Sequence, residues 1–90
     1  MRIRQSVCFS GHVQGVGFRM NAVEQSRGLD VHGFVRNEPD GSVLMDVQGS
    51  RSDVQKLKER ITTTMAGNIE DVVVEELPVN DVENGFRIRS

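Results

Sequence analysis

Residues 11–19, Gly-His-Val-Gln-Gly-Val-Gly-Phe-Arg, place three glycines and an arginine between a strand-like and a helix-like segment. Glycine at 15 and 17 permits positive φ and a close approach of the backbone to a ligand, because no Cβ is in the way. N–H groups of such a loop can converge at the positive end of a helix dipole, where phosphate or carboxylate binds. Arg19 adds paired donors that stay charged. The spacing predicts an anion site, but a plain glycine-rich turn with a solvated Arg19 fits it equally well.

This pattern differs from two common phosphate-binding loops. No Gly-Lys-Ser/Thr follows the segment, so it is not a Walker loop. Gly15 and Gly17 also lack the third glycine that the dinucleotide-binding pattern requires. We therefore treat residues 14–19, called the cradle below, as an anion-binding loop of another kind.

Alternation of apolar and polar residues predicts the strands. Val7 and Phe9 share one face of the first, and Phe34 and Val35 are expected in the interior of the second. Pro39-Asp40-Gly41 is typical of a tight turn, so the second and third strands should form a hairpin. The expected strands are residues 3–10, 31–37, 42–48 and 69–77, followed by a short one at 86–88.

Spacings of three and four residues predict two helices. The first is expected over 18–28, with Gly28 close to its C-terminus. Ser50 or Ser52 can cap the second, which should end between the threonines at 62–64 and Gly67. The stripe of the first helix is Phe18, Ala22, Ser26 and Leu29, and the polar Ser26 weakens it. The stripe of the second is Val54, Leu57, Ile61 and Met65.

The order strand, helix, strand, strand, helix, strand, with a short strand appended, predicts an α+β fold, the ferredoxin-like open sandwich. Its mixed, largely antiparallel sheet should carry both helices on one face, and residues 1–90 should form a single domain. A right-handed crossover makes the first two strands parallel, with the third between them. Their C-terminal ends then share one edge, which brings the cradle beside Asn37.

Two motifs together resemble the acylphosphatase family: Gly11-x-Val-Gln-Gly-Val-Gly-Phe-Arg19, and Gly33-Phe-Val-x-Asn37-x-x-Asp-Gly-Ser-Val43. Phe86-Arg-Ile-Arg89 resembles the usual ending of that family. The resemblance implies hydrolysis of acyl phosphates to carboxylate and inorganic phosphate, without a cofactor or metal. It further implies that Arg19 and Asn37 are catalytic, Arg19 binding the phosphate and Asn37 orienting water. The phosphate-binding residues would be Gln14, Gly15, Val16, Gly17, Phe18 and Arg19.

The residues suit this chemistry. A carboxylate leaves readily, and a loose phosphoryl transition state needs positioning and charge stabilisation more than covalent help. Backbone N–H groups from Gly15 to Phe18 can hold the phosphoryl oxygens with Arg19. Asn37 alone is more typical of a strand-end residue that satisfies the following turn, but its neutral amide can also aim a water. We expect His12 to be a surface residue, and Gln14 to brace the loop.

Charge and composition restrict the partners. A net charge of −2 argues against a broad nucleic-acid surface, and with no tyrosine or tryptophan an RNA-binding sheet lacks its stacking residues. The single cysteine excludes an internal disulfide, and no apolar run approaches the length of a membrane span. We expect a cytoplasmic monomer acting on a small acyl phosphate, without nucleic acid or membrane. The alternative is a regulatory module that binds phosphate or carboxylate without turnover.

Overall fold

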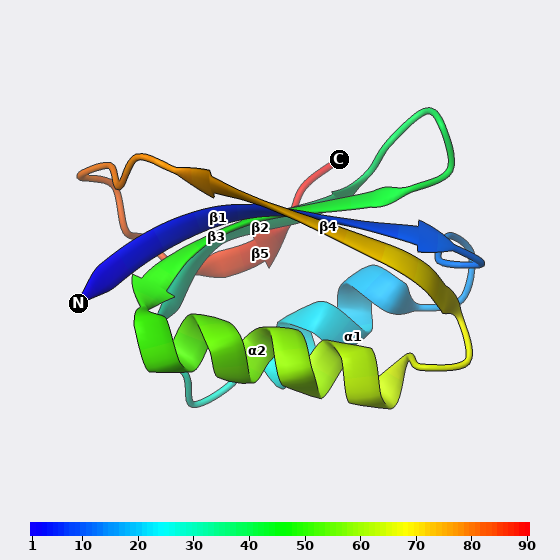
Figure 1. Cartoon of the computed structure of the whole chain (residues 1–90), viewed down its shortest axis with the longest axis horizontal. Coiled ribbons are helices and arrows are strands. Elements are labelled where there is room, and N and C mark those ends of the chain that lie inside the picture. The colour runs from blue at the N-terminus through cyan, green and yellow to red at the C-terminus, as the bar shows by residue number, and fades with distance from the viewer.

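A five-stranded sheet with both helices on one face makes up the computed structural model, which describes residues 1–90 (Figure 1). This is the expected ferredoxin-like α+β fold with an extra C-terminal strand. The elements are β1 (Arg2–Gly11), α1 (Phe18–Gln25), β2 (Val31–Asn37), β3 (Val43–Ser50), α2 (Arg51–Thr64), β4 (Ile69–Leu77) and β5 (Phe86–Ile88).

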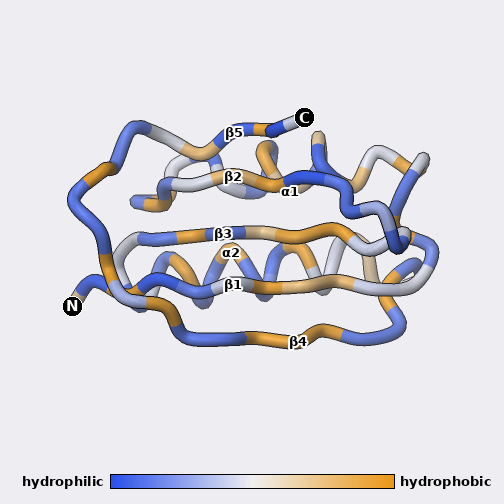
Figure 2. Tube along the Cα trace, turned by 90° about the horizontal axis from the view of Figure 1, so that it is seen from above, coloured by the Kyte–Doolittle hydropathy of each residue, from blue (hydrophilic) through white to orange (hydrophobic).

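The strands lie in the order β4-β1-β3-β2-β5 (Figure 2). Because β3 pairs antiparallel with both β1 and β2, these two strands are parallel to each other, as predicted. β5 adds to the free edge of β2 in parallel. The C-terminal ends of β1 and β2 therefore meet at one edge of the sheet, where the cradle begins after Gly11 and β2 ends at Asn37.

The core lies between the sheet and the helices. The strand alternation places Val7 and Phe9 of β1 there, both fully buried, while the intervening side chains face the open side of the sheet. The Phe18 ring packs against Phe9 with ring centroids 5.0 Å apart. The start of α1, and with it the cradle, is thereby fixed to the sheet. The other core residues are Ile3, Val13, Ala22, Val31, Val35, Val43, Met45, Val47, Val54, Leu57 and Ile61.

Helix α2 forms as its periodicity predicted. Ser50 is its cap, since the Ser50 hydroxyl accepts a hydrogen bond from the Asp53 N–H at 3.2 Å. Val54, Leu57 and Ile61 face the core. Neither α2 nor the shorter α1 is long and apolar enough to cross a membrane.

Phe34 and Val35 lie inside β2, as predicted, and on opposite sides of the sheet. Val35 faces the helices, and the period of two turns Phe34 to the open side. One prediction about local structure was wrong. Helix α1 ends at Gln25 rather than at residue 28, since the Arg27 N–H bonds to the Glu24 carbonyl, three residues back, at 3.2 Å. A turn follows, in which Gly28 has φ 80°.

Candidate functional site

A pocket of about 130 Å³ lies at the sheet edge where the cradle meets the end of β2. It joins the loop before α1, the start of that helix, the last residue of β2 and one residue of β5. The predicted neighbours therefore come together although they are far apart in the chain. The lining residues are Val13, Gly15, Gly17, Phe18, Arg19, Met20, Asn37 and Ile88.

The backbone of the cradle has the conformation that its glycines predicted. Gly15 and Gly17 have φ of 75° and 77°, in the left-handed region. A Cβ at either position would meet nothing within 4 Å, so it is backbone conformation and not crowding that favours glycine there. No backbone N–H from Gly15 to Phe18 donates to a backbone acceptor. Because Gly17 immediately precedes α1, these donors lie at the positive end of the helix dipole.

Arg19 is on the first turn of α1, directly after the buried Phe18, and its side chain is half-buried at the pocket. Arg4 and Arg36 bind carboxylates of neighbouring strand and turn residues. The Arg19 guanidinium, in contrast, makes no hydrogen bond or ion pair with the protein. Its paired donors are therefore available to an anion in the pocket.

Asn37 ends β2 and is exposed, and its side-chain amide has no partner in the protein. The following turn does not need it. Asp40 Oδ1 accepts hydrogen bonds from the N–H and the hydroxyl of Ser42 at 2.9 and 2.6 Å, and these bonds lower the pKa of the Asp40 carboxyl. The structure thus satisfies the turn through Asp40, and leaves the side-chain amide of Asn37, which borders the pocket, without a protein partner.

Gln14 braces the cradle. Its side-chain Nε2 donates to the carbonyls of Glu38 and Ser42 at 2.8 and 2.9 Å. These two bonds tie the loop after β1 to the turn after Asn37, so they set the distance between the two halves of the pocket. Both Nε2 donors are used in this way, and only the backbone N–H of Gln14 is left for an anion.

Replacing Gln14 by alanine should therefore lower the free energy of unfolding by about 1–3 kcal/mol, since its two hydrogen bonds to the carbonyls of Glu38 and Ser42 are lost. Urea denaturation measures the change. Gln55→Ala is the matched control, because Gln55 is exposed on α2 and its side chain makes no hydrogen bond. Equal stability of the two variants would contradict the bracing role.

Other predicted residues contribute differently. His12 is exposed, as expected, and its backbone N–H and carbonyl both bond to Asn68. The Val16 side chain packs against the core rather than lining the pocket. Sequence reasoning missed the apolar rim formed by Met20 and Ile88, whose exposed fractions are 72% and 41%. The alternation in β5 was the one sequence signal that could have placed Ile88 at this pocket. Nothing in the sequence pattern placed Met20 there.

Comparisons with known proteins identify the family and support the fold. The acylphosphatase family model matches residues 5–88. An acylphosphatase of Bifidobacterium longum is 41% identical over 88% of this chain and 82% of its own, and one of Salinibacter ruber is 39% identical over 96% and 92%. The crystal structure of acylphosphatase from Bacillus subtilis has the same fold, with a TM-score of 0.86 over 98% of this chain and 99% of that one, at 24% identity.

Proposed function

The chain belongs to the acylphosphatase family and hydrolyses acyl phosphates, and we propose that the cradle holds the phosphoryl group while Asn37 orients the attacking water. Arg19 and Asn37 are the catalytic residues in this proposal. The backbone of residues 14–18 completes the phosphate site together with the Arg19 guanidinium. The products are a carboxylate and inorganic phosphate.

The observation that carries the proposal is the set of unpartnered polar groups in one pocket. The residues Gly15, Gly17, Phe18, Arg19 and Asn37 border the same small space. The backbone N–H groups of the first three, the Arg19 guanidinium and the Asn37 amide all lack protein partners. A phosphoryl group placed there would accept hydrogen bonds from the cradle on one side and leave its phosphorus open to Asn37 on the other.

In the reaction, the water oxygen forms a bond to phosphorus while the bond from phosphorus to the acyl oxygen breaks. The electron pair of that bond leaves with the carboxylate. In a loose transition state, charge is spread over the three equatorial phosphoryl oxygens, which are the atoms that the cradle and Arg19 contact in this proposal. Asn37 accepts a hydrogen bond from the water, and the proton of the water passes to the phosphate product.

The size of the pocket explains which end of the substrate is recognised. A volume of about 130 Å³ is below the roughly 300–1,000 Å³ of sites that enclose a whole small molecule. We infer that the pocket takes the phosphoryl end, and that the acyl group passes the rim of Met20 and Ile88 towards solvent. Many different acyl groups would be accepted.

Asn37→Ala tests the proposal. We expect kcat for a small aromatic acyl phosphate, measured with chelator present, to fall about 100- to 1,000-fold because a positioned hydrogen-bonding group is lost. Competitive inhibition by inorganic phosphate should persist, since the cradle and Arg19 are unchanged. Asn37→Asp should be as slow and should also weaken phosphate inhibition, because a second negative charge faces the anion.

Two results would contradict the proposal. If Asn37→Ala keeps parental kcat, then Asn37 does not orient the water. If the folded parent binds phosphate but turns over no acyl phosphate, the protein is a binding module of this family rather than an enzyme. Circular dichroism of each variant checks that the fold is retained.

We also propose that the protein acts as a cytoplasmic monomer on this small molecule, without nucleic acid or membrane. Both helices pack on the same face of the sheet, and each buries its apolar stripe within one chain. The charge of −2 gives no overall attraction to nucleic acid.

A further inference from the structure

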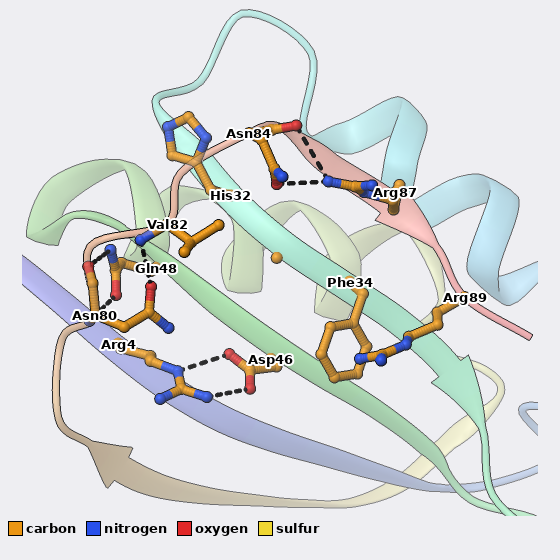
Figure 3. Close-up of a pocket in the computed structure, with 11 residues that line it drawn as sticks. Arg4, His32, Phe34, Asp46, Gln48, Asn80, Val82, Asn84, Arg87 and Arg89 are labelled. Carbon is orange, nitrogen blue, oxygen red and sulfur yellow. Dashed lines mark hydrogen bonds and ion pairs between the residues drawn. The ribbon is translucent and has the colours of Figure 1, made fainter.

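The largest cavity is not the cradle pocket. A groove of about 480 Å³ lies on the open face of the sheet, on the side away from the helices. Its floor is made by β1, β3, β2 and β5, and the connection between β4 and β5 runs along one end (Figure 3). This volume is within the range of sites that enclose a small molecule. We call this cavity the open-face groove.

Two of the arginines that line the groove have no carboxylate partner. Arg87 and Arg89 alternate with Ile88, so both side chains face the groove while Ile88 faces the cradle pocket. Arg87 donates to the carbonyl and the side-chain oxygen of Asn84, at 3.3 and 2.5 Å, and these are neutral acceptors. On the other side of the groove, Arg4 is neutralised by Asp46 through two bonds of 3.0 and 2.8 Å. The excess positive charge therefore lies along β5.

A flat surface lies beside these charges. The Arg89 guanidinium stacks over the Phe34 ring, with its central carbon 4.7 Å from the ring centroid (Figure 3). Arg36 approaches the same ring at 5.5 Å. Guanidinium and phenyl groups both present flat faces to a planar ligand. Phe34 and Val82 are the two apolar residues of the groove, which otherwise has polar walls.

The walls are held in place without a ligand. Gln48 is buried beneath the connection and exchanges two hydrogen bonds with the backbone of Asn80, at 2.9 and 2.8 Å. Its Nε2 also donates to Glu83 at 2.8 Å. His32 Nδ1 accepts from the Gly85 N–H at 3.0 Å. Because these groups are satisfied within the protein, Arg87 and Arg89 are the cations left to bind a ligand, and little ordering is needed on binding.

We propose that the open-face groove binds a small planar aromatic anion. Its carboxylate or phosphate lies against Arg87 and Arg89, and its ring lies against the Phe34–Arg89 stack. This site is separate from the cradle, because the sheet and β5 lie between them and no residue lines both pockets. The inference does not depend on hydrolysis.

Amide chemical shifts recorded by NMR test the proposal. The Arg19→Gln protein is titrated with benzoate, phenyl phosphate and inorganic phosphate, so that binding in the cradle is weakened. We expect the two aromatic probes to shift the amide signals of Gly33, Phe34 and Gly85 and to give saturable binding. The two aromatic probes distinguish a carboxylate from a phosphate headgroup, and inorganic phosphate should bind more weakly than either at these residues.

Matched variants in the same background identify the groups responsible. Arg87→Gln with Arg89→Gln should weaken the binding of both aromatic probes about tenfold or more, since charge-assisted hydrogen bonds are lost. Arg51→Gln, which removes one exposed charge on α2, should leave binding unchanged. Phe34→Leu keeps an apolar side chain and should weaken the aromatic probes but not inorganic phosphate.

The proposal is overturned if the shifts are confined to the cradle, if the double arginine variant binds as tightly as Arg51→Gln, or if inorganic phosphate competes equally with the aromatic probes. Well-dispersed spectra show that each variant is folded. If no probe binds in the open-face groove, the hydrolysis assay of the parent is unaffected. The proposals for the groove and for the cradle are therefore tested independently.

Discussion

Replacing Arg19 by glutamine should lower kcat/KM for an aromatic acyl phosphate by about 10³- to 10⁵-fold, the range found where an arginine stabilises a phosphoryl-transfer transition state. The reason is the position of the side chain. Phe18 is fixed in the core against Phe9, and Arg19, the next residue of α1, lines the pocket beside Gly15 and Gly17. No protein carboxylate competes for its guanidinium. The variant should also lose inhibition by inorganic phosphate, which distinguishes it from Asn37→Ala.

Arg19→Lys separates charge from geometry. Lysine keeps the positive charge but loses the planar pair of donors, so its rate should lie between those of the parent and Arg19→Gln. Arg27→Gln is the control, because Arg27 pairs only with Glu24 on the exposed side of the α1 region and lies outside the pocket. Steady-state kinetics and circular dichroism are measured on all three. Parental activity in Arg19→Gln would remove Arg19 from the mechanism.

The sequence predicted most of the fold because the pattern of apolar residues and the rules of strand topology agree. Alternation in β1 and β3 and the stripe of Val54, Leu57 and Ile61 were strong enough to identify the core faces. Once the element order was known, the right-handed crossover left one arrangement in which the cradle and Asn37 share a sheet edge. The pocket that contains both confirms that arrangement.

The sequence did not indicate which side of the sheet Phe34 faces. Phe34 and Val35 are neighbouring apolar residues, so their side chains point to opposite faces of the strand. The sequence alone does not show which of the two faces the core. Which one does is set by pairing with β3, where Val35 lies opposite the buried Met45 and Phe34 opposite Asp46. The pairing of β2 with β3 therefore determines that Phe34 faces the open side of the sheet.

The sequence also did not reveal the details of the site. Gln14 was expected to brace the loop, but its acceptors, the carbonyls of Glu38 and Ser42, become visible only when the hairpin turn is folded next to the cradle. The open-face groove was missed for a similar reason. Arg87 and Arg89 appeared only as an alternating terminal strand, and their lack of acidic partners is a property of the folded sheet.

Gly33→Ala should strongly destabilise the fold. Gly33 has φ 134°, and a Cβ built there would lie 1.9 Å from the carbonyl oxygen of Asp46, which is backbone of β3 and cannot rotate away. Strand β2 would have to move off β3. We expect the free energy of unfolding to fall by about 3–5 kcal/mol, from backbone strain and overpacking together. That is a large part of the 5–15 kcal/mol typical of a small domain.

Gly28→Ala is the matched control for this prediction, because Gly28 also has a positive φ, of 80°, but a Cβ there would meet nothing within 4 Å. Its cost should be limited to the conformational strain of about 1–2 kcal/mol. Urea denaturation measures the free energy of unfolding of both variants, and equal losses would show that β2 can shift to accept a side chain at position 33.

The pairing of β2 with β3 also determines the position of Asn37, the last residue of β2. A Gly33→Ala protein that still folds should therefore show a reduced kcat, while Gly28→Ala keeps the parental value, since Gly28 lies in the turn after α1, outside both pockets.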